Sequence, residues 1–521
     1  MDRMAHSLLR DPILTVRLAG GETRRLTLPQ VLEHLSTEED EIRSFTALRP
    51  HQAHPWHAFL VQIAAMASKR AGADGKGVSA EHWTRWLLTL SGGSEEAWTL
   101  LVDDLAQPAL LQPPVPEGTL GGFKNRAETP DQIDMLVTAK NHDVKATRMR
   151  RATPEHWFYA LLTLQTMEGF SGKNNYGIAR MNGGFSSRPC VALSPGLRWD
   201  ERFRRDLGVL LDRYDQTARD HGFALDSGLS LGWLAAWDGT QSLVLGQIDP
   251  YVVEVCRRVR LMGGENRNQE TTAAISNSQV TRIDAKDTKG DIGDPWTPID
   301  RAEKKAITVQ KTGFTYKLTQ ELLLGGKYEP SASQRVQSED AGDMLFLASA
   351  LVRGQGKTEG LHQRALPIPA RVRMSLLKAE TRDRVSAMAQ RRVEIVDTVR
   401  QKVLHPALCS LLQGAPNRLD LRDERTRPWK SALDTAVDSL FFEHLWRDMD
   451  GGDAERHWQQ TVIDLARAQL ELALDSVPIP SIRIYRARAA ATRVFEGSAR
   501  KQFPDIFEHD KQTPSEQGAV Q

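Results

Sequence analysis

Cysteine is scarce in this sequence. The three cysteines, Cys190, Cys256 and Cys409, lie far apart, and they form neither a CxxC nor a CxxxC pair. Three scattered cysteines are too few for a disulfide framework, and zinc sites built from thiolates use closely spaced cysteine pairs, so we expect neither feature. We therefore expect no metal ion, no cofactor and a protein that works in a reducing cytosol.

An excess of charge of one sign is also lacking. The 521 residues include 68 Lys and Arg against 67 Asp and Glu, which gives a net charge near +1. A uniformly basic coat for nucleic acid is therefore excluded, and any anion-binding role must come from local patches. No apolar run has the length of a membrane span, and the first residues are too interrupted by charge for a signal peptide, so we expect a cytoplasmic protein.

Familiar catalytic motifs are absent as well. The sequence contains no HExxH metalloprotease motif, no Walker phosphate loop and no GxSxG nucleophile elbow. One cluster has the character of an enzyme site, HQAHPWH, in which His51, His54 and His57 recur every third residue. This cluster fits either a metal-dependent hydrolase or, in the interpretation that we favour, polar residues at the start of a helix.

What the sequence does contain changes once along its length. Residues 11–369 alternate short β-like pieces such as ILTVRL with helical patches and long loops rich in Gly, Pro, Asn and Asp. Beyond residue 369 the pattern is almost wholly helical. We predict an α+β fold with a large irregular mixed domain over residues 1–369, a four-helix bundle over residues 370–503 and a flexible tail over residues 504–521.

Four amphipathic patterns predict the helices of the bundle. The segments QGAPN, DGGD and SVPIPS separate them, and Gly and Pro at these points end helices and turn the chain. The apolar positions that define the four helices are Ile395, Val399 and Val403; Leu433, Ala436, Val437, Leu440 and Phe441; Val462, Leu465, Ala466, Leu472 and Ala473; and Ala487, Ala491, Val494 and Phe495.

Residues 171–189, SGKNNYGIARMNGGFSSRP, form a polar segment that contains no acid. Its glycines remove side chains so that a backbone can come close, its asparagines can donate and accept hydrogen bonds, and its cations can meet phosphate. This mixture suits a narrow nucleic-acid groove, although an ordinary surface loop has a similar composition. The candidate contacts are Lys173, Asn174, Asn175, Gly177, Arg180, Asn182, Gly183 and Gly184.

A second cationic segment precedes the first. Residues 139–151, AKNHDVKATRMRR, carry five cations and one acid, which gives a local charge of +4. Such density attracts phosphates, and a solvated charge run is the alternative. The predicted helix over residues 153–170 separates the two segments, so both could touch one polyanion from the two ends of that helix.

Taken in order, these features resemble the CasA family, the large subunit of the type I-E CRISPR Cascade surveillance complex. The resemblance rests on DPILTVRLAGGETRRLTLPQVL at the start, NNYGIARMNGG in the glycine-rich loop, LLLGGKYEPSAS further on, and the closing helices with LFFEHLW. It touches most of the chain through short motifs whose specificity lies in their order and spacing.

The resemblance implies a DNA reader without catalytic activity. In this family, guide-RNA pairing selects the target, while CasA recognises the protospacer-adjacent motif (PAM) in double-stranded DNA, mainly from the minor groove. It then helps to open the duplex into an R-loop and docks a helicase-nuclease. The implied partners are the DNA target, the CRISPR RNA and the other Cascade subunits, including the small-subunit dimer.

The family's glycine loop corresponds to residues 175–184, where only the pair Gly183 and Gly184 is a clear match. The resemblance also implies a loop near the guide RNA and the PAM at about residues 138–149, with Lys140, Asn141, His142 and Lys145 as contacts. A hairpin lysine that probes the groove would be Lys304, Lys305 or Lys311; exposed lysines that guard a strand edge are the alternative.

A glutamine wedge opens the duplex in this family, and the present sequence departs from that pattern. The matching position is Ser331, which is small for a residue that must fill an unstacked base step. Either Tyr328, Pro330 or Gln334 replaces it, or the duplex is opened in a different way here. The zinc-binding CxxC of some members is missing between Cys256 and Trp296.

The last helix of the predicted bundle has a basic face, with Arg483, Arg486 and Arg493 near one side. The resemblance implies a track for displaced DNA there, and a solvated surface or a protein interface is the alternative. Two other functions stay open for the whole chain: a scaffold that joins protein partners without reading DNA, and the hydrolase built on His51, His54 and His57.

Overall fold

The structure is a computed structural model, and it describes residues 6–37, 41–136, 149, 151–263, 270–354, 357–450 and 453–508. The chain divides into two units. The first comprises Met1–Phe314 and Lys327–Arg373, and the second comprises Thr315–Gly326 and Met374–Gln521. Residues 315–326, which the sequence analysis placed in the first domain, thus belong with the helical second unit.

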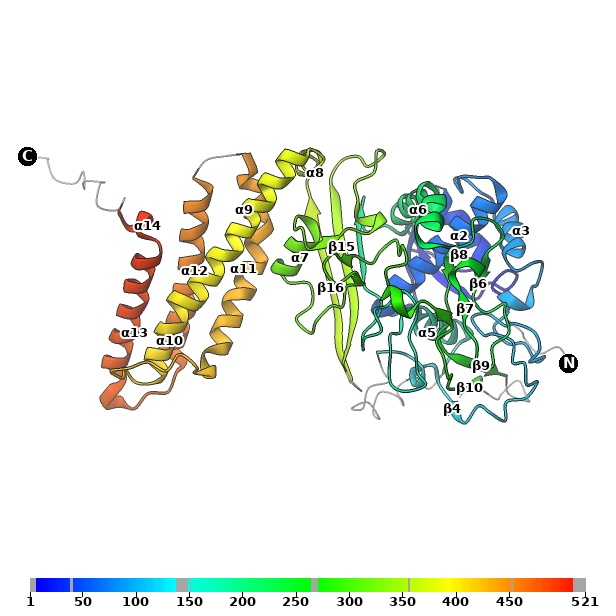
Figure 1. Cartoon of the computed structure of the whole chain (residues 1–521), viewed down its shortest axis with the longest axis horizontal. Helices are drawn as coiled ribbons and strands as arrows, with labels where there is room; N and C mark the ends of the chain where they lie inside the picture. Colours follow the sequence, from blue (N-terminus) through cyan, green and yellow to red (C-terminus); the bar gives the residue numbers. More distant parts are fainter. Residues whose placement is uncertain are drawn as a thin grey trace, which may run out of the picture. The chain divides into compact units, whose positions relative to one another are not determined.

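Helix α2 (Ala53–Ala71) belongs to the buried core of the first unit and is seen among α6, α3 and β8 in Figure 1. It is buried along almost its whole length, as expected for a helix that is apolar on all sides. It packs on α3 (Ala80–Leu90), α5 (Pro154–Met167), α6 (Trp199–His221) and strand β8 (Ile248–Val253). α1 (Leu28–Ser36) adds to this core and begins with a capping box between Thr27 and Gln30.

The described residues of the first unit also form six small sheets, and most of their strand pairs are antiparallel. Together with the helices, they confirm the predicted α+β class and its irregular character. The sheets are β2-β1-β3 (Thr23–Leu26, Leu14–Leu18, Ile42–Phe45), β4-β10-β9 (Asn125–Ala127, Thr272–Ser276, Arg258–Met262), β11-β7 (Ile283–Asp284, Leu243–Val244), β13-β12-β14 (Lys305–Ala306, Ile299–Asp300, Tyr328–Glu329), β16-β15-β5 (Lys357–Ile368, Met344–Gly354, Cys190–Ser194) and β6-β8 (Leu229–Leu231, Ile248–Val253).

The longest strands form the β15–β16 hairpin (Figure 1). Burial along the first part of β15 alternates residue by residue, which is the period of a strand with one face in the core. Its other edge pairs with β5, so that Phe346 lies between Leu366 and Leu193. This sheet supports the residues that follow α5, because Ser187 exchanges hydrogen bonds with Leu351 of β15.

The second unit contains the predicted four-helix bundle. The first helix runs through α9 (Ala379–Thr398), a π-helical turn (Val399–Leu404) and α10 (His405–Leu412), and the others are α11 (Arg427–Arg447), α12 (Ala454–Ser476) and α13 (Ser481–Gln502). α7 (Tyr316–Leu323) joins the same unit: the Tyr316 backbone N–H donates to Asp438 of α11 and its ring lies against Phe441. α8 (Ala370–Leu376) precedes the bundle.

Of the 17 predicted apolar positions of the bundle, 12 are buried; Ala436, Leu440, Leu465 and Val494 are half-buried, and Leu472 is exposed. Leu472 is 59% exposed, because Val462, Ala466 and Ala473 define the inner face of α12 and position 472 points away from it. Leu470 takes its place in the core.

The segment from residue 504, which we expected to be a flexible tail, begins with the short helix α14 (Pro504–Glu508). Burial of Phe503 and Ile506 fixes this helix, and residues 509–521 lie outside the described residues. None of the helices in the described ranges combines the length and the apolar character that crossing a bilayer requires.

Candidate nucleic-acid interface

The glycine-rich segment forms a closed loop between the end of α5 and the start of β5. Its neck consists of backbone hydrogen bonds from Gly169 to Ser186 (2.9 Å) and from Phe170 to Gly184 (3.2 Å). Below the neck, the N–H of Arg188 donates to the carbonyl of Met167 at 3.0 Å. The loop therefore has a defined shape, although its sequence is typical of an irregular surface segment.

Gly177 is needed for a backbone crossing inside the loop. A Cβ atom at this position would lie 2.4 Å from the carbonyl carbon and 2.6 Å from the Cα of Gly169. A Cβ at Gly169 would in turn lie 2.6 Å from the carbonyl oxygens of Gly184 and Ser186. The close approach that we expected Gly177 to offer to DNA is thus used within the protein itself.

A buried ion network holds the base of the loop. Arg180 is 2% exposed; its guanidinium pairs with Glu254 and lies 3.7 Å from Asp294. Asp294 also accepts two hydrogen bonds from Arg188, of 2.5 and 2.9 Å. Arg180, which we predicted to meet phosphate, is therefore a structural residue here, because its charge is already neutralised away from solvent.

Arg257 stabilises the neck of the loop through contacts with residues on its N-terminal side. Its guanidinium lies 2.8 Å from Glu168 and donates to the hydroxyl of Ser171 at 3.1 Å and to the carbonyl of Tyr176. Burial by itself would lower the pKa of Arg257, but Glu168 raises it above the usual value, so the pair stays charged. Arg353 of β15 pairs with the same carboxylate.

Asn182 connects the loop to a hairpin that lies far away in the sequence. Its side-chain amide donates to the carbonyl of Ala306 at 2.8 Å and to the hydroxyl of Thr308 at 2.5 Å. Its amide oxygen accepts from the N–H of Gly184 at 3.0 Å. We predicted that Asn182 contacts DNA, but its side-chain amide forms hydrogen bonds that hold the loop against the hairpin.

The remaining polar residues of the loop are at the surface. Lys173 is exposed, and Asn174 and Asn175 are half-buried. Asn174 adopts a left-handed conformation (φ 67°) and its carbonyl accepts from the N–H of Ser278 at 3.1 Å. Gly183 is exposed with φ 80°, a conformation that favours glycine.

The hairpin β12–β13 presents one of the three candidate lysines at its tip. Asp300 accepts from the backbone N–H groups of Ala302 (3.0 Å) and Glu303 (3.1 Å), which shapes the turn, and Lys304 follows with φ 47°. Lys305 pairs with Glu303. Lys304 and Lys311 are exposed and form no ion pair within the described residues, so these two present free charges.

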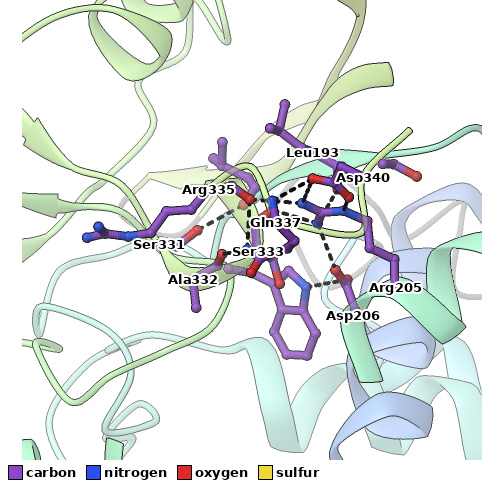
Figure 2. A network of polar contacts seen from close by, with 12 residues as sticks. Leu193, Arg205, Asp206, Ser331, Ala332, Ser333, Arg335, Gln337 and Asp340 are labelled. Atoms are coloured by element: carbon purple, nitrogen blue, oxygen red, sulfur yellow. Dashed lines mark hydrogen bonds and ion pairs between the residues drawn. The ribbon is translucent and has the colours of Figure 1, made fainter. Parts of the chain in front are cut away.

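Two of the four candidate wedge residues are buried. The hydroxyl of Ser331 donates to the carbonyl of Val191 at 3.1 Å, and Gln334 is 6% exposed. Figure 2 shows why this segment is fixed: Arg205 donates to the carbonyl groups of Leu193 (2.8 Å), Ser333 (2.9 Å) and Arg335 (2.9 Å) and to both oxygens of Asp340. Ser331 and Gln334 therefore cannot reach a ligand in this conformation.

The other two candidates are nearer to the surface. Tyr328 lies on β14, opposite Asp300 of β12, and both Tyr328 and Pro330 are half-buried. The Lys327 ammonium lies 5.2 Å from the centre of the Tyr328 ring. One small sheet thus carries Tyr328 on β14 and leads to Lys304 at the β12–β13 turn, while Asn182 attaches the glycine-rich loop to β13.

The arrangement can be compared with known proteins. No family model and no curated protein sequence matches the chain. Solved structures do match. The CRISPR-associated protein Cse1 from Acidimicrobium ferrooxidans is 14% identical over 97% of this chain and 100% of its own, with a TM-score of 0.62. CasA (Cse1) from Thermus thermophilus is 15% identical over 96% of this chain and 100% of its own (TM-score 0.62), and Cse1 from Thermobifida fusca is 12% identical over 96% of this chain and 98% of its own (TM-score 0.64).

The chain has the fold of the Cse1/CasA proteins. The similarity covers nearly the whole chain in each comparison, so it includes the mixed first unit and the helical second unit alike. The resemblance inferred from short motifs is thereby confirmed at the level of the fold, while sequence identities of 12–15% leave the function to be argued from the site.

The predicted guide-proximal residues Lys140, Asn141, His142 and Lys145 lie outside the described residues. The chain that leads toward them is held by buried contacts. Asp134 accepts hydrogen bonds from Gln52 (2.8 Å) and from the N–H of Leu136 (2.9 Å). The carbonyl of Met135 accepts from Thr358 of β16 at 3.1 Å, so the hairpin that supports the glycine-rich loop also holds this segment.

The three histidines of HQAHPWH are buried at the start of α2 and have different surroundings. His51 lies 2.8 Å from Asp134, and His57 lies 2.9 Å from Asp206. Burial lowers the pKa of His54 well below its usual value and also lowers that of His57. Within the described ranges, no three His, Cys, Asp or Glu side chains converge on a position for a metal ion.

Arg483, Arg486 and Arg493 are exposed on α13, as the predicted basic face requires. Two large apolar side chains lie among them: Ile482 is 92% exposed and Tyr485 is 85% exposed. A surface of this kind suits either a nucleic-acid strand or a protein partner.

Sequence reasoning missed the residues that hold the loop in place and the aromatic side chains within it. Glu254, Arg257 and Asp294 carried no signal, because they are far from the loop in the sequence. Phe170, Tyr176 and Phe185 did carry one: aromatic residues in a Gly- and Asn-rich segment are unusual. Their rings form a cluster, with centroids 6.2 Å apart for Phe170 and Tyr176 and 5.2 Å apart for Phe170 and Phe185.

Proposed function

We propose that this chain is the non-catalytic large subunit of an RNA-guided type I-E Cascade complex. In this role it recognises the PAM in double-stranded DNA, mainly from the minor groove, promotes duplex opening and R-loop formation, and docks the helicase-nuclease. Its partners are then the DNA target, the CRISPR RNA, the small-subunit dimer and the other Cascade subunits. The fold shared with Cse1/CasA structures supports this assignment.

One observation carries the DNA-reading part of the proposal. The acid-free loop and the lysine hairpin lie more than a hundred residues apart, yet the Asn182 amide joins them at the Ala306 carbonyl. Lys173 is exposed on the loop and Lys304 on the hairpin, Glu254 and Asp294 are buried in ion pairs, and the exposed Glu303 pairs with Lys305. Free cations and exposed amides are the groups that bind phosphates and groove edges.

The test is binding of target duplexes with and without a PAM by the reconstituted complex. We expect Lys173→Ala combined with Asn175→Ala to reduce PAM-dependent binding, since Lys173 is exposed and Asn175 is only half-buried in the same loop. Lys76→Ala, an exposed lysine in the turn after α2, is the matched control and should bind as the wild type does. Unchanged binding by the double variant would favour the scaffold function, in which the chain joins proteins without reading DNA.

A further inference from the structure

Phe185 is a large apolar side chain held at the surface of the glycine-rich loop. It is 37% exposed and follows Gly183 and Gly184, which have no side chains to cover it. Behind it lies the ring of Phe170, inclined by 60°, and Phe170 in turn contacts Tyr176 at 45°. The three rings form an aromatic cluster on a segment that is otherwise polar.

The loop around this cluster is fixed on both sides. The carbonyl of Gly184, the residue before Phe185, accepts from the N–H of Phe170, and the Gly184 N–H donates to Asn182. Ser186, the residue after it, accepts from the N–H of Gly169. An exposed phenylalanine whose two neighbours are hydrogen-bonded in this way is preorganised, so it loses little conformational entropy when a ligand covers it.

The occupant that fits is a base step of DNA. Proteins that read the minor groove often insert an apolar side chain between base pairs, which unstacks the step and bends the duplex. Residues 171–189 contain no acid that would repel the phosphates, and exposed Lys173 lies on the same loop. An aromatic ring offers a stacking surface to any base, irrespective of sequence.

The segment expected to supply a wedge is poorly suited to that task. Ser331 and Gln334 are buried beside the Arg205 network, and the Tyr328 ring has the Lys327 ammonium 5.2 Å from its centre. Pro330 remains, but it is half-buried and short. Phe185 is 37% exposed, and the residues on both sides of it are held by hydrogen bonds.

We propose that Phe185 is the residue that inserts at the base step next to the recognised motif, with Phe170 and Tyr176 supporting its ring. This inference rests on the proposed DNA-reading function and adds the residue that opens the duplex. Recognition and opening are then carried by the same loop: Lys173 and the exposed backbone hold the DNA, and Phe185 separates the bases.

The experiment compares two DNA targets in the reconstituted complex. One is a closed duplex with a PAM and with 2-aminopurine at the first base after it; the other has the same PAM followed by a mismatched bubble. Fluorescence of 2-aminopurine reports unstacking. Phe185→Ala should weaken closed-duplex binding by about tenfold or more and reduce the fluorescence increase, because stacking on one aromatic ring has an effect of that size. Binding to the bubble should stay as in the wild type, since its bases are already unpaired.

Phe185→Tyr keeps the aromatic ring and should open the duplex as the wild type does. Tyr328→Ala and Pro330→Ala test the competing wedge positions.

Two results would overturn the inference. One is duplex opening that is unaffected in Phe185→Ala; the other is an equal loss of binding to both targets, which would make Phe185 a general DNA contact. Failure of the proposed function looks different: Lys173→Ala with Asn175→Ala would then leave PAM dependence intact on both targets. Unchanged thermal unfolding of Phe185→Ala confirms that the variant is folded.

Discussion

The side-chain amide of Asn182 donates to the carbonyl of Ala306 over 2.8 Å, and the two residues are 124 positions apart. This hydrogen bond joins the glycine-rich loop to strand β13 and so sets the position of the loop relative to the lysine at the tip of the hairpin. The same side chain also donates to the Thr308 hydroxyl and accepts from the N–H of Gly184, so it links the turn of the loop to residues 306–308. Loop and hairpin therefore form one surface.

Substitution of this residue tests whether that surface reads DNA. Asn182→Ala leaves the Ala306 carbonyl without its donor, and such a loss costs about 1–3 kcal/mol for a buried group. We expect a lower melting temperature and a loss of PAM-dependent binding in the assembled complex that exceeds the loss of PAM-independent binding. Equal loss on both DNA targets would show that loop position does not determine recognition.

Gly177→Ala should destabilise the loop, because the new Cβ would meet the backbone of Gly169 at 2.4 Å and backbone atoms cannot move aside easily. The measurement is the melting temperature of the isolated chain. Gly208→Ala is the matched control: this glycine is within α6 and has no atom within 4 Å of the added Cβ. The control should gain stability, by about 0.5–1 kcal/mol, because alanine favours a helix. A Gly177→Ala chain as stable as the wild type would contradict the backbone crossing.

Arg180→Met should reduce the free energy of unfolding, measured with urea, because it leaves Glu254 as a buried charge with no cation. Breaking one partner of a buried pair costs about 3–5 kcal/mol. Lys173→Ala, on the exposed side of the same loop, should unfold as the wild type does. The reverse order, with Arg180→Met stable and PAM binding lost, would make Arg180 a DNA contact as first predicted.

The salt dependence of DNA binding distinguishes the hairpin lysines. Each phosphate contact that is lost reduces the slope of log affinity against log salt by about 0.9 for duplex DNA. Lys304→Ala, and to a similar degree Lys311→Ala, should produce such a reduction, since both charges are free. Lys305→Ala should produce a smaller one, because Glu303 already pairs with that lysine. Equal slopes in the wild type and all three variants would exclude the hairpin from phosphate binding.

Stability should fall in mild acid because of His54. Burial is the main cause that lowers the pKa of this imidazole well below its ordinary 6.5, and Arg188 lowers it further. The folded chain then keeps His54 neutral, whereas the unfolded chain takes up a proton as the pH falls below 6.5, so the unfolded state gains by about 1.4 kcal/mol per pH unit. Urea unfolding from pH 7 to pH 5 measures this loss. His54→Phe should reduce the dependence to the part that His57 contributes, because burial also lowers the pKa of His57. An unchanged slope would show that other groups cause the loss.

Local patterns in the sequence determined much of this protein. The 3.6-residue period of apolar side chains predicted the four helices of the bundle, because helical packing depends on residues a few positions apart. Polar and basic composition located the glycine-rich loop and the basic face of α13, since exposed charges need no partner. Alternation and turn residues gave the mixed α+β class, and the order of short motifs gave the Cse1/CasA fold.

Only the tertiary structure decided which of the candidate side chains are accessible. Arg180, Asn182 and Ser331 have polar groups that suit a ligand, but each meets a protein partner that is 74, 124 or 140 positions away in the sequence. The sequence shows that a charged group or an amide is present. Long-range contacts in the folded chain decide whether that group forms a hydrogen bond or ion pair within the protein or stays available to a ligand. The same contacts leave Lys173 and Lys304 exposed, and Phe185 remains 37% exposed against the ring of Phe170.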